Sequence, residues 1–160
     1  MILVSHIIIS GLLGTQAQNY FLAALIGLAS HFVLDWIPHW DNYLHPDFIK
    51  RAEEGAGFLK KSYFWEDMLK VAADIAIGLV LFLIFYKYFG FSNFLFSFAG
   101  IIFGVLLDPL QLLYLMTKWR PYRPMADFHR SLQKTKLSFW PGILIQFATI
   151  AAVLFAVLYL

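Results

Sequence analysis

Long apolar stretches separated by short polar segments make up most of the chain. Three of them are as long as the ~20 apolar residues that cross a bilayer as a helix: about 64–89, 92–117 and 137–160. A fourth, 20–38, carries its polar residues at its C-terminal end, and the shorter 2–14 stretch is expected to pair with it through a turn. We therefore predict an all-α integral membrane protein, with about five transmembrane helices forming a single domain over 1–160.

Composition supports the membrane assignment and excludes several classes of function. The chain is 61% hydrophobic and 14% charged, whereas soluble domains are about half apolar and a quarter charged. A net charge of +2 is too small to indicate nucleic-acid binding. Because there is no cysteine, disulfides and thiolate ligands are excluded, and any bound metal must be held by nitrogen and oxygen.

The basic residues predict the orientation of the bundle. All Lys and Arg residues except Lys70 and Lys87 lie in two connections, 39–62 and 118–136, which face the same side if there are five spans. By the positive-inside rule that side is cytoplasmic, so a multi-pass protein of the inner (plasma) membrane is expected, with its N-terminus inside and its C-terminus outside.

Each basic connection also contains a segment that opens with proline, 46–54 and 124–134. Proline suits the first turn of a helix, and Met125, Phe128 and Leu132 recur at helical spacing. We expect short interfacial helices here; ordinary solvated loops are the alternative.

Ionisable residues inside the apolar stretches point to a site. The candidates come from four different spans: His6, then His31 with Asp35, then Asp74, then Asp108. His31 and Asp35 are four residues apart and share a helix face. At 1.5 Å per residue, all five lie about 5–14 Å from the cytoplasmic side. Buried charges are costly in a bilayer, and Lys70 is the single cation nearby in the sequence. We therefore predict that His31, Asp35, Asp74, Asp108 and His6 bind a divalent metal, with Zn²⁺ favoured over Mn²⁺ or Mg²⁺.

Each residue also has a purely structural explanation. Asp74 could pair with Lys70, His6 could bond to Ser10, and Asp108 could accompany a kink at Pro109. His31 and Asp35 could simply hydrogen-bond within their helix.

Residues around these spans suggest catalytic roles. A metal with an open position activates water as a nucleophile, and His39 and His129 are the candidate proton-transfer residues. We expect the 118–136 loop to cover the site, with His129 facing inward. Its Arg120, Arg123 and Arg130 are candidates for binding an anionic, lipid-like substrate, because guanidinium groups bind phosphate through paired hydrogen bonds.

Short motifs carry a resemblance to a known family. "GLASHFVLDWIPH" resembles the SHxxxD segment of the YdjM-like family of membrane-bound proteins assigned as metal-dependent hydrolases. "GVLLDPLQ" looks like a degenerate form of that family's LPDxD segment, and "FHRSLQ" is similar to its His-Arg patches. The resemblance implies metal binding by His31, Asp35 and Asp108, and His6 matches the family's N-terminal histidine.

The leading functional hypothesis is a membrane-embedded hydrolase of a lipid phosphoester or related ester at the cytoplasmic leaflet. The alternatives are a proton or divalent-cation transporter or channel, and a metal-binding structural subunit. Membrane lipids are the expected partners, nucleic acid is not expected, and the oligomeric state is left open.

The topology can be measured directly. Because the basic connections are expected to stay in the cytoplasm, a reporter fused after Leu160 should lie outside it. Only a reporter that functions outside the cytoplasm is then expected to be active at this position. Activity of a strictly cytoplasmic reporter at that position would contradict the predicted orientation.

Overall fold

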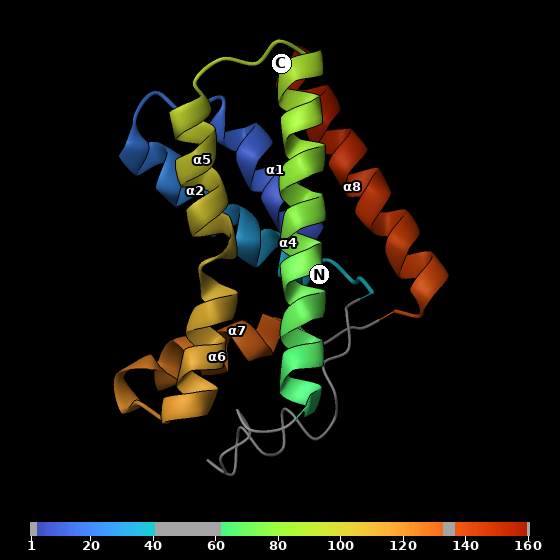
Figure 1. Ribbon diagram of the computed structural model, residues 1–160. Helices are drawn as coiled ribbons and strands as arrows, with labels where there is room; N and C mark the ends of the chain where they lie inside the picture. Colours follow the sequence, from blue (N-terminus) through green and yellow to red (C-terminus); the bar gives the residue numbers. More distant parts are fainter. Residues whose placement is uncertain (1–2, 41–61, 133–136, 160) are drawn as a thin grey trace.

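The computed structural model describes residues 3–40, 62–132 and 137–159, and its regular elements are helices (Figure 1). In chain order they are α1 (Leu3–Gly14), α2 (Tyr20–Trp36), α4 (Ser62–Tyr88), α5 (Phe94–Val105), α6 (Leu107–Thr117), the 3₁₀ turn η2 (Arg120–Tyr122), α7 (Arg123–Leu132) and α8 (Phe139–Tyr159). The all-α prediction is confirmed. The 124–134 segment is helical, as α7, while its position at a membrane interface stays a prediction. The 46–54 segment lies outside the described residues.

Among the described residues, three helical stretches are long and apolar enough to cross a membrane: Phe64–Tyr88, Phe94–Tyr114 and Phe139–Tyr159. The helices α1 and α2 are apolar but shorter, with 12 and 17 residues. A membrane protein is therefore supported, while five complete spans stay a prediction.

Exposed aromatic side chains mark both ends of α4 and α8, which run in the same direction in Figure 1. Each of these helices has an exposed tryptophan near its first residue and an exposed tyrosine at or near its last: Trp65 and Tyr88 in α4, and Trp140 and Tyr159 in α8. Tryptophan and tyrosine are enriched at membrane interfaces. The rise from Trp65 to Tyr88 is ~34 Å, close to a ~30 Å hydrocarbon core with its borders.

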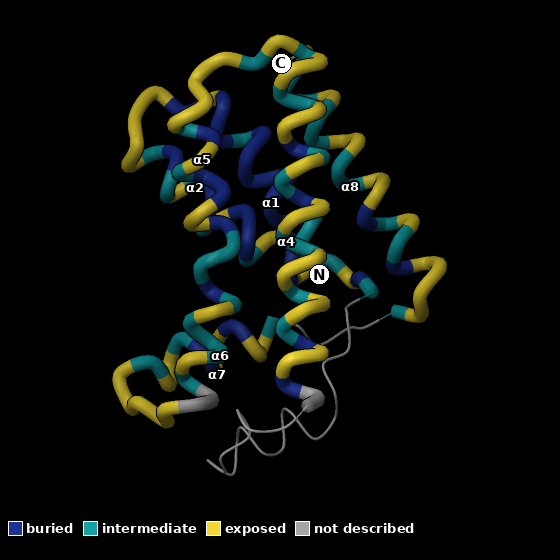
Figure 2. The backbone as a smooth tube through the Cα atoms, in the orientation of Figure 1, coloured by how far each residue is buried: buried dark blue, intermediate teal, exposed yellow. Residues whose placement is uncertain are grey.

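The central helix of the bundle is α1, which packs against α2, α4, α5 and α8. Its buried Ile7, Ile8 and Leu12 meet Phe82 of α4 and Ile101 of α5. Figure 2 shows α1 mostly buried while α4 and α8 present exposed residues along their length. Those exposed positions are largely apolar, as expected for helices that face lipid.

Glycines allow α1, α2 and α5 to approach closely. A Cβ atom on Gly27 would overlap the carbonyl oxygen of Gly100, and one on Gly100 would come within 2.6 Å of the carbonyl oxygen of Ser10. A Cβ on Gly104 would overlap the Ser10 side chain. Lipid tails are as apolar as the helices, so association depends on such close packing and not on a hydrophobic driving force.

The 92–117 stretch, expected as one span, is divided. Helix α5 ends at Val105 and α6 begins at Leu107, with Leu106 between them. Pro109 explains the break, because it has no N–H to donate to the carbonyl of Val105. The kink that the sequence left open at Asp108–Pro109 is therefore present, and it lies beside the candidate site.

Close packing at Gly27 makes a prediction. Gly27→Ala should destabilise the protein by about 1–3 kcal/mol, because the added methyl group pushes α2 away from α5. The measurement is thermal unfolding in detergent. Ala152→Val, at an exposed position of α8, is the matched control and should leave the unfolding temperature unchanged. Equal stability of the two variants would mean that α2 and α5 are not in close contact.

Candidate metal centre

Five ionisable side chains from four helices converge near the break between α5 and α6. Their ligand atoms form two groups, each with all its atoms within 4.8 Å of one another: His6 with His31 and Asp108, and His31 with Asp35 and His129. We call these five residues the His/Asp cluster. They come from α1, α2, α6 and α7, so residues far apart in the sequence meet at one point.

Distances within the cluster suit ligands of one ion. The Nε2 atom of His129 lies 2.6 Å from Oδ2 of Asp35 and 3.0 Å from Nε2 of His31. The Nε2 atom of His31 lies 3.2 Å from the same carboxylate oxygen, and Nε2 of His6 lies 3.3 Å from Oδ1 of Asp35. Ligands bound tetrahedrally at ~2.0–2.1 Å are ~3.3 Å apart. The atoms of His31, Asp35 and His129 are therefore close enough to bind one divalent cation after small adjustments, and His6 lies next to them.

Burial is uneven across the cluster. His6, His31, Asp35 and His129 are almost fully buried, whereas the Asp108 side chain is 32% exposed. The Oδ1 atom of Asp108 is also farther from its neighbours, at 3.8 Å from Nε2 of His129 and 4.0 Å from Nε2 of His31. Asp108 therefore forms the open edge of an otherwise enclosed donor set.

The helix break orients His31. Gly104 lies in the last turn of α5, where carbonyl groups lack partners within the helix. Its carbonyl oxygen is 2.7 Å from Nδ1 of His31. A carbonyl only accepts, so Nδ1 carries the proton, and Nε2 of the neutral ring presents its lone pair to the cluster. Metal-binding histidines are commonly held in this way by a second, non-metal partner.

His6 provides the strongest local indication of a missing partner. Within the described residues neither nitrogen of its buried ring has a hydrogen bond: Nδ1 has no partner, and Nε2 has only the 3.3 Å contact with Oδ1 of Asp35. The ring stacks on His31 with centroids 4.4 Å apart. The hydroxyl of Ser10 donates to the backbone carbonyl of His6, so it does not satisfy the ring. An unsatisfied buried polar group costs about 1–3 kcal/mol. A cation at the cluster would remove that cost.

The structure does not bring Asp74 into either group. Its Oδ2 accepts a hydrogen bond of 2.6 Å from the backbone N–H of Leu3, at the start of α1. This carboxylate therefore caps the first turn of α1, where free N–H groups and the helix dipole favour a negative charge. The sequence left open a pairing of Asp74 with Lys70. In the structure, Nζ of Lys70 forms an ion pair with Oδ1 of Asp67 at 2.8 Å.

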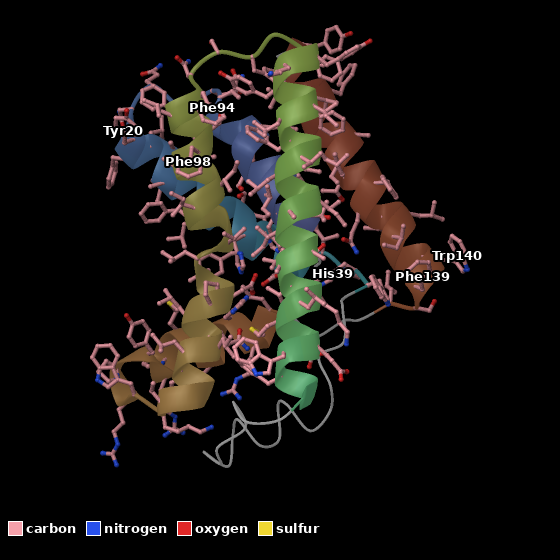
Figure 3. The ribbon with its side chains drawn as sticks, viewed as in Figure 1. Tyr20, His39, Phe94, Phe98, Phe139 and Trp140 are labelled. Atoms are coloured by element: carbon pink, nitrogen blue, oxygen red, sulfur yellow. The ribbon has the colours of Figure 1, made fainter. Side chains whose placement is uncertain are left out.

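His39, expected as a proton-transfer residue, also lies outside both groups. Its Nδ1 donates to the carbonyl of Ile37 at 2.6 Å, and its own carbonyl accepts from the N–H of Leu137 at 2.9 Å. Figure 3 shows it on the side of the molecule where α8 begins. His39 thus joins the segment after α2 to the segment before α8. Its neighbours Asp41 and His45 lie outside the described residues.

The arginines and His129 occupy opposite faces of α7 and η2. His129 and Ala126 are buried, as the inward-facing orientation expected for His129 requires. Arg120, Arg123 and Arg130 are exposed. Asp127 pairs with two of them, at 3.5 Å from Nε of Arg123 and 2.6 Å from Nη2 of Arg130. The sequence analysis assigns His129 to proton transfer, whereas the structure places its ring where a metal ligand would lie.

This arrangement of buried His and Asp side chains could hold a metal ion. Three imidazoles and two carboxylates are the nitrogen and oxygen donors that Zn²⁺ and similar ions accept. No protein-family model, curated protein or solved structure matches the chain. Function must therefore be argued from the cluster itself.

Metal retention tests the cluster with a closely matched pair of variants. Asp35→Asn should lower bound Zn²⁺ roughly tenfold or more, because it removes a central anionic donor. Asp74→Asn should keep the metal, since the amide oxygen can still accept the Leu3 N–H. Metal content per chain, measured by mass spectrometry after dialysis, decides between them. Equal loss in both variants, or in neither, would contradict this assignment of ligands.

Proposed function

We propose that the protein is an integral-membrane, metal-dependent hydrolase that acts on a phosphoester or related ester of a lipid at the cytoplasmic face. The observation that carries the proposal is the enclosed set of His6, His31, Asp35 and His129 with the partly exposed Asp108 at its edge. Structural zinc sites are closed by four protein ligands, whereas catalytic sites use three and keep one position accessible. The group of His31, Asp35 and His129 has three ligands, with His6 and Asp108 beside it.

The metal would supply hydroxide from water near neutral pH. Zn²⁺ is the favoured ion because imidazole nitrogen predominates in the donor set, with Mn²⁺ or Mg²⁺ as alternatives. The chain's own contribution begins with Asp108. Its Oδ1 lies 3.8–4.0 Å from two of the imidazole nitrogens, beyond hydrogen-bonding distance of both, so it is available to a water molecule at the exposed edge of the site. Asp108 would take the proton that this water loses as it attacks the ester, and would return it to the leaving oxygen.

Lipid is the favoured substrate class because of where the cluster lies. It is set among apolar helices, and η2 and α7 carry Arg120, Arg123 and Arg130 on the exposed side of the segment that supplies His129. We propose that these arginines attract an anionic head group. Arg123 and Arg130 are already held over the same carboxylate of Asp127, so a phosphate can take the place of that carboxylate between them.

Local hydrogen bonding favours the hydrolase over a transporter or channel. A pathway needs polar groups free to face permeant ions along its length, and Ser97, Gln146 and Thr149 are polar residues of α5 and α8 that could extend one beyond the cluster. Gln146 bonds to Ser5 and to the carbonyl of Trp40. The hydroxyls of Ser97 and Thr149 donate to backbone carbonyls of their own segments. These groups join helices or satisfy local backbone. The accessible edge at Asp108 similarly favours catalysis over a purely structural metal site.

Hydrolysis by Asp108→Asn tests the function and the role of this residue together. Native protein loaded with Zn²⁺ should hydrolyse at least one lipid phosphoester in a panel of anionic lipids in mixed micelles. Asp108→Asn should retain the metal through His31, Asp35 and His129 and lose about 10²–10⁴-fold in turnover, the usual contribution of a general base.

Glu66→Gln, which changes an exposed carboxylate on α4 outside the cluster, is the control and should keep its metal and most of its turnover. Absence of hydrolysis by the metal-loaded native protein across the panel would refute the proposed function. Loss of metal in Asp108→Asn would instead make Asp108 a ligand.

A further inference from the structure

A single glutamine joins α8 to two other parts of the bundle. Gln146 is buried in α8, a largely apolar helix. Its Oε1 accepts a hydrogen bond of 2.9 Å from the hydroxyl of Ser5 on α1, and its Nε2 donates one of 2.7 Å to the carbonyl of Trp40, in the segment after α2. Both ends of the amide are therefore used, and they hold α8 to segments 141 and 106 residues away in the sequence.

The amide is not needed to fill space at this position. A methionine would occupy a similar volume without the cost of burying a polar group among apolar helices. Hydrogen bonds between helices add direction to their association, which apolar packing alone does not provide. Gln146 bonds at both ends only when the Ser5 hydroxyl and the Trp40 carbonyl lie at the correct distances from it. The amide therefore fixes the alignment of α1 relative to the segment after α2.

That segment is itself held firmly against the start of α8. The ring of Trp40 packs edge-on against the ring of Phe139, with centroids 4.9 Å apart. A Cβ atom on Gly142 would overlap the backbone nitrogen of Trp40, so no side chain separates the two backbones there. The segment after α2 is thus a fixed point, and Gln146 links α1 to it.

The two bridged segments lead to residues of the His/Asp cluster. Ser5 directly precedes His6 on α1, and Trp40 follows Asp35 by five residues. The Nε2 atom of His6 lies 3.3 Å from Oδ1 of Asp35, and neither ring nitrogen has a hydrogen bond within the described residues. Hydrogen bonding to the ring therefore does not hold His6 at this distance. Its place beside Asp35 depends on where α1 lies, and the bond to Ser5 acts at the adjacent residue.

We propose that Gln146 is a positioning residue of the metal centre. Its two hydrogen bonds hold α1 at the axial position in which His6 meets Asp35. Gln146 touches neither the ion nor the substrate and acts through His6. This inference rests on the metal centre of the proposed function, but it does not depend on the reaction or the substrate.

Loss of the Gln146 bonds should displace His6 without releasing α1. The first turn of α1 is also held by Asp74 of α4, which accepts a hydrogen bond from the N–H of Leu3. The buried Ile7 and its neighbours pack against α4 and α5. A variant that lacks the amide is therefore expected to fold, with a less well aligned donor set.

Metal affinity tests the proposal. Metal-free protein in detergent is titrated with Co²⁺, whose visible spectrum reports its coordination, and Zn²⁺ affinity is obtained by competition. Gln146→Met removes both hydrogen bonds and should weaken binding about tenfold, at the lower end of the effect of residues that orient metal ligands. Thr149→Val, on the same helix, is the matched control. The hydroxyl of Thr149 donates to the carbonyl of Ile145 in its own helix, so this variant should bind as tightly as the native protein.

Two further measurements distinguish positioning from a merely structural role. Ser5→Ala should weaken Co²⁺ binding by a factor similar to that of Gln146→Met, and Gln146→Met should have no further effect once His6→Ala is present. If Gln146 only stabilised the bundle, Gln146→Met would lower the unfolding temperature of the metal-free protein and leave the Co²⁺ affinity and spectrum unchanged. That result, or an equal loss of affinity with and without His6, would overturn the proposal.

The same titrations separate this proposal from the proposed function. Native protein that binds Co²⁺, loses affinity on Gln146→Met and hydrolyses no lipid in the panel would refute the proposed function and leave the role of Gln146 standing. Native protein that binds neither Co²⁺ nor Zn²⁺ would overturn both.

Discussion

Bringing ionisable side chains together inside an apolar bundle depends on how closely its helices approach. Near the cluster, the backbones of α1, α2 and α5 pack directly against one another, because Gly27, Gly100 and Gly104 have no side chain between them and their neighbours. Larger residues at those positions would hold the histidines of α1 and α2 apart. The polar residues thus depend on small apolar ones for their mutual distances, as is usual where lipid provides no driving force for helix association.

A second constraint is electrostatic. Asp35 is buried against three imidazoles, and His6 has a ring with no hydrogen bond in the described part of the chain. Such a group of atoms is expensive in an apolar environment unless a charge organises it. A divalent cation would satisfy the lone pairs of the imidazoles and the carboxylate together. The break at Leu106 contributes by leaving the Gly104 carbonyl to fix the tautomer of His31.

Part of this site could be predicted from the sequence, for identifiable reasons. The i,i+4 spacing placed His31 and Asp35 on one face, and the shared depth of His6 and Asp108 indicated that they could meet. Depth is only one coordinate, however, and Asp74 has the same depth but faces the start of α1. The rotation of a helix about its own axis depends on its neighbours, which hydropathy does not reveal. His39 and His129 are both next to apolar stretches, and only the folding of α7 against α2 and α6 distinguishes them. The helical fold could be predicted because apolar stretches long enough to cross a bilayer satisfy their backbone hydrogen bonds as helices. The short first apolar stretch also indicated a short first helix, and α1 has 12 residues.

The origin of His129 has a consequence for the biogenesis of the protein. Four of the five cluster residues belong to the apolar helices α1, α2 and α6, whereas the fifth belongs to the amphipathic helix α7. Hydrophobicity can therefore assemble the apolar helices without completing the cluster, which also requires α7 to pack against α2 and α6. Until that packing forms, Asp35 lacks its 2.6 Å contact with His129. The full donor set thus depends on the docking of one short, polar-faced helix.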